Sequence, residues 1–381
     1  MIIGIDATRN RSGGARAHLV GLLGAFDPQN FGINEVHVWA YRSLLDSLPN
    51  KPWLKKHHSV YLEKSLIHQI LWQIFMLPSE VRNFKCDMFL NTDAGALSAI
   101  TPVVTMSRDM LSYESGEIER YGFSKARLRL YLLRLVQNRS LRRSDGVIFL
   151  TQYAGKIIQQ SCGKLPNIAF IPHGVGTNFS SIEKNNYDIN PEESIKLIYI
   201  SNADLYKHQW KVIEAAEILR KNGRNISLTL IGGGSGKAYQ MLLNQKNISD
   251  PHGEYIFLKE YVPQSELPNF LSTSDIFIFA SSCENMPNTL VEAMAAGLPI
   301  ACSDRGPMPE VLEEAGVYFN PESSLSISDA VTNLIENEKL RKSLGIKSKS
   351  LSKLYSWERC ARETWLFLIK TFNEMELKRN E

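Results

Sequence analysis

The chain has 381 residues, a hydrophobic fraction of 44%, a charged fraction of 22% and a formal net charge of +3. Such a length exceeds what one hydrophobic core usually supports, so two domains are expected. A nucleic-acid-binding protein would need a concentrated basic stripe, which this small net charge does not suggest, so we expect no nucleic-acid partner. The five cysteines are scattered, odd in number and without C-x-x-C spacing, which argues for a reducing compartment and against a disulfide framework or a zinc site.

Short apolar runs alternate with helix-period segments along the chain, which predicts an α/β fold with parallel sheets. In the first half, strands are expected at 2–6, 36–40, 87–91, 102–106, 146–150 and 167–171. In the second half, they are expected at 197–200, 227–232, 254–258, 275–280, 299–302 and 317–319. Between the halves, the segment 177–194 is polar, rich in Asn and Ser and without periodicity, so it is predicted to be an interdomain linker.

The first strand has no positively charged region before its apolar run, so we do not expect a signal peptide. No window approaches the roughly 18 uninterrupted apolar residues of a membrane span. A cytoplasmic protein, at most peripheral to a membrane, is therefore expected.

Gly13 and Gly14 follow the first strand and precede a helix. Glycines at this point let the backbone approach a ligand, and the start of the following helix favours a phosphate. The alternative is a plain strand-to-helix turn.

The segment from Lys125 to Arg143 is basic and rich in leucine. Such a helix can lie against anionic lipid head groups. It can equally pack on a core with a charged face in solvent, and the sequence leaves both interpretations open.

A glycine-rich run at 232–237 invites comparison with a P-loop. Its spacing does not fit, because Ile231 stands where the first glycine belongs and Ala238 replaces the Ser or Thr that would hold magnesium. We therefore do not expect ATPase chemistry.

Two glutamates, Glu284 and Glu292, bracket the most informative segment of the chain. Glu284 follows an apolar strand, and Pro287 suits the first turn of a helix that carries Glu292. The unpaired N–H groups of that first turn favour an anion such as a phosphate. A carboxylate on each side of a phosphate-sized gap suggests a nucleotide-sugar site, whereas the alternative is two solvated acids.

The run from Glu284 to Glu292, continued by the residues Ala-Met-Ala-Ala-Gly-Leu-Pro, resembles the E-x7-E signature of retaining glycosyltransferases with the GT-B fold, in particular glycosyltransferase family 4. Weaker matches extend along nearly the whole chain. The resemblance implies two doubly wound Rossmann-like domains that face each other across a cleft. These are an acceptor-binding domain at 1–176 and a nucleotide-sugar-binding domain at 195–355, with a C-terminal helix at 356–381 that returns to the first domain.

The resemblance also implies roles for individual residues. Glu292 binds the ribose hydroxyls, and Glu284 holds hydroxyls of the donor sugar and supports an oxocarbenium-like transition state. Lys207 and backbone N–H groups at 288–290 stabilise the leaving diphosphate. The full set of expected donor-binding residues is Gly13, Gly14, Asn202, Gly233, Val262, Asn285, Met286, Pro287, Asn288, Thr289, Leu290, Glu292 and His173.

The chain departs from the family pattern in two places. The usual Gly-Arg pair of the second domain appears as Ser201-Asn202, so Arg305 and Arg108 are candidates for the second cation. A usual His-Asp pair of the first domain is replaced around Arg108 and Asp109, which we expect either in the cleft with a catalytic role or in a solvated loop. His173 lies in a match to Pro-Asn-Gly-Val and is expected in the cleft or in a structural turn.

The predicted function is retaining transfer of a hexose from a nucleoside diphosphate sugar to a hydroxyl of a lipid-linked or surface glycan, such as O-antigen, lipopolysaccharide or capsule. GDP-mannose is favoured over UDP-hexoses as donor, and membrane contact would use the basic face of the first domain at the cytoplasmic side of the inner membrane. No cofactor and no metal are expected, because no Asp-x-Asp occurs in the chain. The alternatives are a glycoside hydrolase, a nucleotide-sugar epimerase on the same scaffold and a non-catalytic sugar-nucleotide sensor.

Overall fold

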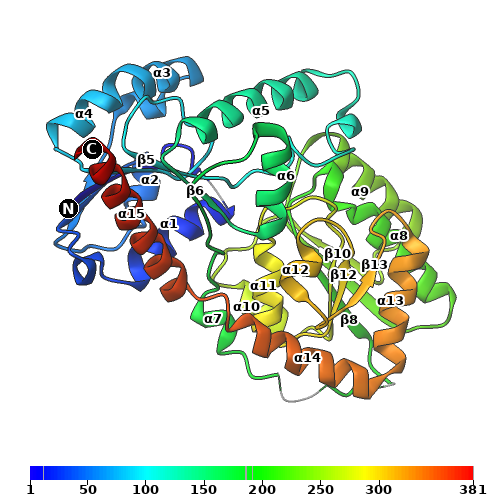
Figure 1. Cartoon of the computed structure of the whole chain (residues 1–381). Helices are drawn as coiled ribbons and strands as arrows, with labels where there is room; N and C mark the ends of the chain where they lie inside the picture. The colour runs from blue at the N-terminus through cyan, green and yellow to red at the C-terminus, as the bar shows by residue number, and fades with distance from the viewer. Residues whose placement is uncertain (12, 185–186, 191, 381) are drawn as a thin grey trace. The chain divides into compact units, whose positions relative to one another are not determined.

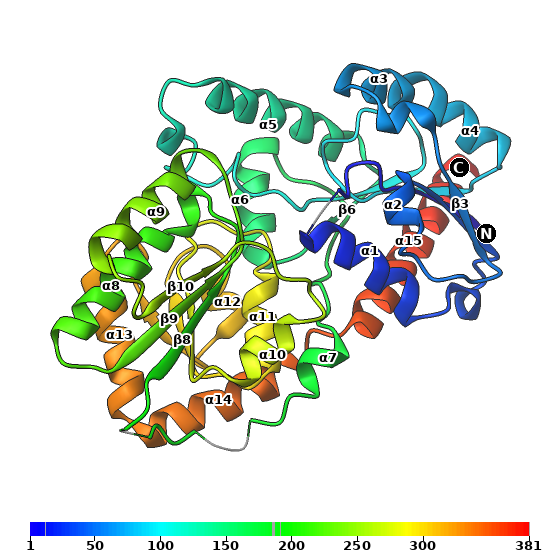
Figure 2. The same cartoon turned by 180° about the vertical axis from the view of Figure 1, so that it is seen from behind.

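A computed structural model describes residues 1–11, 13–184, 187–190 and 192–380, and the chain divides into two units (Figures 1 and 2). Unit 1 comprises Met1–Gly174 and Ser356–Glu381, and unit 2 comprises Val175–Tyr355. The chain therefore leaves unit 1 after Gly174 and returns to it at Ser356. The predicted first domain ended two residues later, at 176.

Unit 1 is built on a seven-stranded parallel sheet with the order β3-β2-β1-β4-β5-β6-β7. Its strands are β1 (Ile2–Asp6), β2 (Glu35–Trp39), β3 (Leu54–His57), β4 (Met88–Asn91), β5 (Val103–Met106), β6 (Gly146–Phe149) and β7 (Ile168–Phe170). The sequence did not predict β3, which has the composition Leu-Lys-Lys-His and only one buried residue. An edge strand needs no continuous apolar run, because part of it faces solvent.

The helices of unit 1 are α1 (Gly13–Ala25), α2 (Arg42–Leu45), α3 (Leu66–Leu71), α4 (Leu77–Asn83), α5 (Lys125–Arg143), α6 (Gln152–Cys162) and α15 (Trp357–Asn380). A π-helical turn, η3 (Trp72–Met76), joins α3 to α4, and short 3-10 turns lie at η1 (Pro28–Phe31), η2 (Val60–Glu63) and η4 (Glu119–Tyr121). The C-terminal helix α15 packs against α1, with Trp365 and Leu368 fully buried. The predicted return of the last helix to the first domain is confirmed.

Unit 2 has a six-stranded parallel sheet with the order β10-β9-β8-β11-β12-β13. Its strands are β8 (Ile195–Ile200), β9 (Ile226–Ile231), β10 (Ile256–Lys259), β11 (Ile276–Phe279), β12 (Ile300–Ser303) and β13 (Val317–Phe319). Every residue of β11 and β12 is buried, as expected for central strands covered by helices on both faces.

The helices of unit 2 are α7 (Thr177–Ser180), the 3-10 turn η5 (Leu205–Lys207), α8 (Gln209–Lys221), α9 (Gly236–Ser249), α10 (Leu267–Ser272), α11 (Asn288–Ala295), α12 (Met308–Leu312), α13 (Ser324–Glu336) and α14 (Glu338–Ser352). Gly223, with a φ of 79°, follows the end of α8, and the Arg224 N–H donates to the Leu219 carbonyl. Among the described helices of both units, none has the length and apolar character needed to cross a membrane.

The segment predicted to be a linker, 177–194, belongs to unit 2 instead. It begins with α7, and the buried Tyr187 donates a hydrogen bond from its hydroxyl to the Gly297 carbonyl, 3.1 Å away. The Arg341 guanidinium donates to the Tyr187 carbonyl at 2.7 Å. Residues 185, 186 and 191 lie outside the described residues. A polar, aperiodic sequence is thus held in place by partners more than 100 positions away.

Both sheets have a point where the strand order reverses. In unit 1 it lies between β1 and β4, and in unit 2 between β8 and β11. In open parallel sheets, ligands bind outside the carboxyl ends of the strands at this switch point. The loops after these four strands are therefore the places to look for chemistry.

Candidate functional site

In unit 2, the loops that follow β8, β9, β10 and β11 are tied to one another at the carboxyl edge of the sheet. The Ala203 N–H donates to the Gly233 carbonyl at 2.9 Å, and the Ser282 N–H donates to the Tyr206 carbonyl at 2.8 Å. Gly232 has a φ of 126°, and a Cβ there would lie 2.2 Å from the Ser201 carbonyl oxygen, so only glycine allows this approach. The expected donor-binding residues Asn202, Gly233 and Val262, and the expected catalytic residue Glu284, all lie in or next to these loops.

The predicted catalytic pair of unit 2 meets directly: the Lys207 ammonium forms an ion pair with the Glu284 carboxylate. Lys207 ends η5, after β8, and Glu284 follows β11, so the pair spans the switch point of this sheet. The two side chains are 13% and 14% exposed. The Lys207 nitrogen also lies 4.9 Å from the ring centroid of Tyr206 and 5.9 Å from that of Phe279. The sequence predicted both residues in the site but not their mutual contact.

Glu292 is the most unusual carboxylate of the unit. It lies on α11, is 7% exposed, and accepts one hydrogen bond at Oε1 from the Gln264 side chain, 3.0 Å away. Its other oxygen, Oε2, has no hydrogen-bond partner among the described residues. Burial raises the pKa of Glu292, the hydrogen bond from Gln264 offsets part of this rise, and the resulting pKa is about 7. A buried acceptor without a donor is costly, and a ligand hydroxyl would satisfy it.

The start of α11 differs in detail from the predicted phosphate cradle. The helix begins at Asn288 with Pro287 just before it. Within the loop, the Asn288 N–H donates to the Met286 carbonyl at 3.0 Å, and the Leu290 N–H donates to the Pro287 carbonyl at 3.1 Å. Of the three predicted amide donors, Thr289 alone has no acceptor among the described residues. The side chains of Asn285, Met286, Pro287 and Leu290 are buried.

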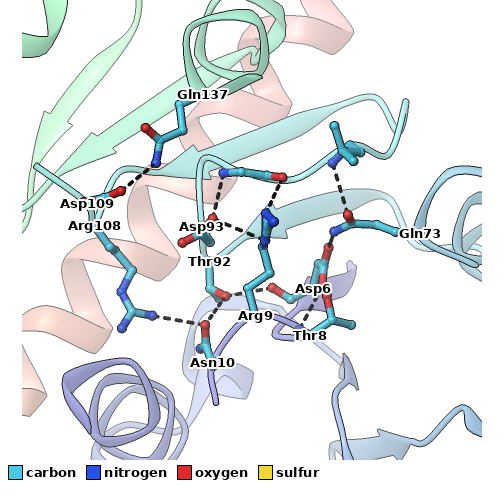
Figure 3. A network of polar contacts seen from close by, with 12 residues as sticks. Asp6, Thr8, Arg9, Asn10, Gln73, Thr92, Asp93, Arg108, Asp109 and Gln137 are labelled. Atoms are coloured by element: carbon cyan, nitrogen blue, oxygen red, sulfur yellow. Dashed lines mark hydrogen bonds and ion pairs between the residues drawn. The ribbon is translucent and has the colours of Figure 1, made fainter. Parts of the chain in front are cut away.

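In unit 1, a polar network occupies the corresponding switch point, between β1 and β4 (Figure 3). The buried Asp6 carboxylate accepts hydrogen bonds from the Thr8 N–H at 3.0 Å, from the Thr8 hydroxyl at 2.6 Å and from the Gln73 side chain. Burial raises the pKa of Asp6 in spite of these donors, which lower it. The Thr92 hydroxyl lies 2.8 Å from the Asp6 carbonyl and 3.0 Å from Asn10 Oδ1, which links the two strand ends.

Arg108 and Asp109 follow β5 and point in different directions (Figure 3). Arg108 donates from Nη1 to Asn10 Oδ1 at 3.2 Å, whereas Asp109 accepts from the Gln137 side chain at 3.3 Å and from the Leu111 N–H at 3.0 Å. Burial lowers the pKa of Arg108 to about 10, and burial raises the pKa of Asp109. Arg108 therefore joins the switch-point network, while Asp109 faces the α5 side of the unit.

The remaining predicted residues of unit 1 lie near the start of α1. Gly13 begins this helix with a φ of 58° and nothing within 4 Å of an added Cβ, and Gly14 follows it. His173 is buried, with its ring stacked at 4.5 Å on His18 of α1 and 5.9 Å from the Trp357 ring. Burial lowers the pKa of His18 well below its usual range. This aromatic cluster matches the structural-turn interpretation of His173 more closely than a position open to ligand.

Sequence reasoning missed several residues of both edges: Asp6, Asn10, Gln73 and Thr92 in unit 1, and Gln264 in unit 2. Asp6 ends a buried strand, which is a signal that could have been used. Gln264 and Gln73 carried no comparable signal, because their partners lie far away in the sequence.

Among the described residues, no group of three or more His, Cys, Asp or Glu side chains is placed to hold a metal ion. In the same part of the chain, none of the five cysteines forms a disulfide bond: Cys86, Cys162, Cys283, Cys302 and Cys360.

Residues 181–351 match the family described as Glycosyl transferases group 1. This match lies within unit 2 and includes the Lys207–Glu284 pair, the Glu292 carboxylate and the loops that surround them.

Two curated relatives differ in how much of the chain they match. The O-antigen chain mannosyltransferase B of Escherichia coli is 29% identical over 104 residues, which is 27% of this chain and 27% of the relative. An uncharacterized glycosyltransferase of Methanocaldococcus jannaschii is 24% identical over 335 residues, which is 81% of this chain and 77% of the relative. The first match thus spans about a quarter of each protein, and the second extends beyond the segment that matches the group 1 family.

Solved structures resemble the whole chain. Sucrose-phosphate synthase from Thermosynechococcus elongatus superposes with a TM-score of 0.74 and 14% identity, covering 98% of this chain and all of the other. Anabaena HepE, in complex with UDP and glucose, superposes with a TM-score of 0.70 and 15% identity, covering 97% of this chain and all of the other. At such identities the likeness shows the fold, and the predicted fold class, an α/β protein of the GT-B type with two doubly wound parallel sheets, is confirmed.

Proposed function

We propose that this protein is a retaining glycosyltransferase that uses a nucleoside diphosphate sugar as its donor and needs no metal ion. One observation carries the proposal: Glu292, in the segment that matches the group 1 family, keeps a buried oxygen without a hydrogen-bond partner among the described residues. A ribose carries two adjacent hydroxyls that can donate to such an oxygen. When ribose binds, an acceptor whose burial is costly in the empty site gains its hydrogen bond.

The Lys207–Glu284 pair supplies the charges that the reaction needs. Lys207 leaves Glu284 to bind the diphosphate, where its positive charge stabilises the negative charge that develops on the departing group. Glu284 then faces the sugar, holds its hydroxyls and stabilises the positive charge that develops at the anomeric carbon. The Thr289 amide at the start of α11 adds a hydrogen-bond donor to the diphosphate.

The bond changes balance without a covalent intermediate on the enzyme. The bond from the anomeric carbon to the diphosphate oxygen breaks, and the bond to the acceptor hydroxyl oxygen forms on the same face of the sugar. The departing phosphate oxygen takes the acceptor proton. The chain has to bind, orient and exclude water, since water would otherwise hydrolyse the donor.

In unit 1 we propose a supporting role for Arg108 with acceptor or donor oxygens. Its guanidinium is fixed at one nitrogen by Asn10, at the switch point of the sheet. Arg108 forms no ion pair with a carboxylate among the residues that the structure describes, and burial lowers its pKa to about 10, so this cation is a favourable partner for an electron-rich oxygen. Asp109, which is held by Gln137 and Leu111, helps to position the β5 loop from which Arg108 extends.

For the donor sugar, we propose GDP-mannose, with UDP-hexoses next. The similarity to an O-antigen chain mannosyltransferase supports mannose, and a structural neighbour in complex with UDP and glucose keeps UDP-glucose among the candidates. The proposed acceptor is a hydroxyl of a bacterial surface glycan.

A thermal-shift panel with UDP, GDP, ADP and dTDP tests the donor site. One diphosphate should raise the melting temperature, and Glu292→Ala should remove that shift. Glu314→Ala is the matched control, because Glu314 is an exposed glutamate of the same unit that pairs with Lys347. If no diphosphate stabilises the protein, or if Glu292→Ala responds like the native chain, the proposed donor site is wrong.

Product analysis tests the reaction itself. With the identified nucleotide sugar and a glycan acceptor, the new linkage should keep the anomeric configuration of the donor, as read by NMR. Release of free nucleotide at the same rate without acceptor would indicate an epimerase or hydrolase instead.

A further inference from the structure

Helix α5 exposes a stripe of leucines in addition to the leucines that it buries. Its inward side buries Leu130 and Leu141 together with the amides Gln137 and Asn138. On the outer side, Leu128, Leu132 and Leu135 are 61%, 55% and 64% exposed. These three recur at intervals of four and three, so they form one outward stripe. A helix whose outer face met only water would carry polar side chains there, so the leucine stripe is suited to an environment that is partly apolar.

The same helix is strongly basic. Its sequence contains seven Lys and Arg residues and no Asp or Glu. The cationic residues Lys125, Arg129, Arg139, Arg142 and Arg143 are exposed along with the leucines. Phe123, just before the helix, is fully exposed and lies beneath the Arg127 guanidinium, 5.6 Å from its ring centroid. An outward face that combines leucine, phenylalanine and arginine fits a surface with both apolar and anionic groups.

A second exposed apolar element lies at α3 and η3. Leu66, Ile67, Leu71, Ile74, Phe75 and Met76 are between 37% and 69% exposed. Residues 65–79 contain no Asp, Glu, Lys or Arg. Contiguous exposed apolar side chains without charge are rare on soluble surfaces and mark a contact with another apolar phase.

Both elements belong to unit 1 and lie along the same edge of it. In Figures 1 and 2, which view the chain from opposite sides, α3 and α5 are both at the upper edge of this unit. An uncharged apolar element and a basic, leucine-striped helix are thus presented side by side on one edge.

We propose that α3, η3 and α5 together form a docking surface for a bilayer that contains anionic lipids. The α3–η3 side chains enter the acyl boundary, the α5 leucines lie at the interface, and the α5 cations bind anionic head groups. A second copy of the chain is disfavoured as occupant, because a symmetric contact would bring two strongly basic α5 faces together. The inference concerns where the protein acts and does not depend on the identity of the donor sugar.

Vesicle flotation with the full chain tests this surface. Vesicles of phosphatidylcholine with about one third phosphatidylglycerol, a composition chosen to supply the negative surface charge, should carry the protein to the top of a gradient. Binding should weaken as salt screens the head groups, and pure phosphatidylcholine vesicles should bind less. No flotation with the anionic vesicles, or equal flotation with both kinds, would overturn the proposal.

Two surface variants locate the contact. Ile67→Ser/Leu71→Ser/Phe75→Ser should lower the partition coefficient at least on the order of a hundredfold. Arg129→Gln/Arg139→Gln/Arg143→Gln should lower it on the order of a hundredfold and remove most of the salt dependence. Matched controls in unit 2, Ile248→Ser/Ile346→Ser/Leu354→Ser and Lys339→Gln/Lys342→Gln/Lys353→Gln, change equally exposed side chains and should bind like the native chain.

The melting temperature and the nucleotide-induced shift show that each variant is folded, so that loss of flotation can be assigned to the surface. Sedimentation velocity tests the rival occupant. If the native chain is a dimer and the α3–η3 variant is a monomer, the surface is a self-association face and the membrane proposal fails.

Discussion

The two sheets differ in how fully the buried carboxylates near their switch points are hydrogen-bonded within the chain. In unit 1, the Asp6 carboxylate receives three hydrogen bonds from Thr8 and Gln73, and Thr92 links the adjacent strand ends. In unit 2, the Glu292 carboxylate receives a single bond and keeps one oxygen without a partner among the described residues. The carboxylate at the first edge is satisfied from within the chain, and the carboxylate at the second is left incomplete. Such a difference indicates a mainly structural network in unit 1 and a ligand-dependent one in unit 2.

The largest effect is expected for Glu284→Gln. This change keeps the shape of the side chain but removes its charge, so the transition state loses an electrostatic contribution worth about a hundredfold to a thousandfold in turnover. Steady-state rates with donor and acceptor measure the loss, and the nucleotide-induced thermal shift should remain. Native turnover in this variant would remove Glu284 from its assigned role.

Removing the Asp6 carboxylate, which is hydrogen-bonded within the chain, should lower the free energy of unfolding rather than the rate of catalysis. Asp6→Ala leaves the Thr8 N–H and the Gln73 side chain without their buried acceptor, which should cost about 4 kcal/mol of unfolding free energy. Denaturant unfolding measures this cost. Glu292→Gln is the matched comparison from the incomplete edge, and at pH 5, where burial keeps Glu292 protonated in the folded protein, it should leave stability nearly unchanged. If the stability ranking is reversed, the contrast between the two edges is wrong.

The pKa of Glu292 makes stability depend on pH in a defined direction. Its value rises from 4.5 in the unfolded chain to about 7 in the folded one. Between these values the folded protein binds more protons than the unfolded chain, so stability falls as pH rises from 4.5 to 7. The loss is about 3 kcal/mol and is complete above pH 7.

The variant Glu292→Gln cannot titrate at this position and should therefore lack that pH-dependent loss. Unfolding free energies of the native and variant chains at pH 5 and pH 8 measure it. Identical pH profiles would show that Glu292 is not held in the neutral form by burial.

A smaller and more selective effect is expected for Arg108→Gln. Loss of one charge-assisted contact should raise the acceptor KM about tenfold, while the nucleotide-induced thermal shift stays as in the native chain. Arg224→Gln is the control from unit 2, because Arg224 is 38% exposed, pairs with Glu336 and precedes the amino end of β9, away from the carboxyl edge of the sheet. Equal effects of the two variants on the acceptor KM would contradict a specific role for Arg108.

The smallest effect is expected from removing divalent metals. If Lys207 and the α11 amide stabilise the diphosphate, an excess of EDTA should leave turnover unchanged. Loss of activity that returns with Mg²⁺ or Mn²⁺ would show that a metal supplies charge in place of these groups.

Prediction from the sequence succeeded where a signal was local. The strands β11 and β12 are continuous apolar runs, so burial on both faces could be inferred directly. The positions of Glu284 and Glu292 followed from one strand, one proline and one helix within 20 residues. Each of these features is set by neighbours in the chain.

Prediction failed where partners are distant in the sequence. The segment 177–194 has the composition of a linker, yet Tyr187 is buried by contacts to Gly297 and Arg341. The pairing of Gln264 with Glu292, and that of Gln73 with Asp6, depends on which loops the topology brings together. β3 was missed because its Lys-Lys-His sequence reflects a solvent-facing edge rather than a buried strand.

The return of α15 to unit 1 has a consequence for how the protein is made on the ribosome. Trp365 and Leu368 fill the interior of unit 1, but they are synthesised only after all of unit 2 has emerged. Unit 2 has a continuous sequence and can fold as soon as it is complete, whereas the α1 surface that receives α15 stays uncovered until α15 has been synthesised. A nascent chain stalled before residue 356 should therefore bind chaperones through its amino-terminal half.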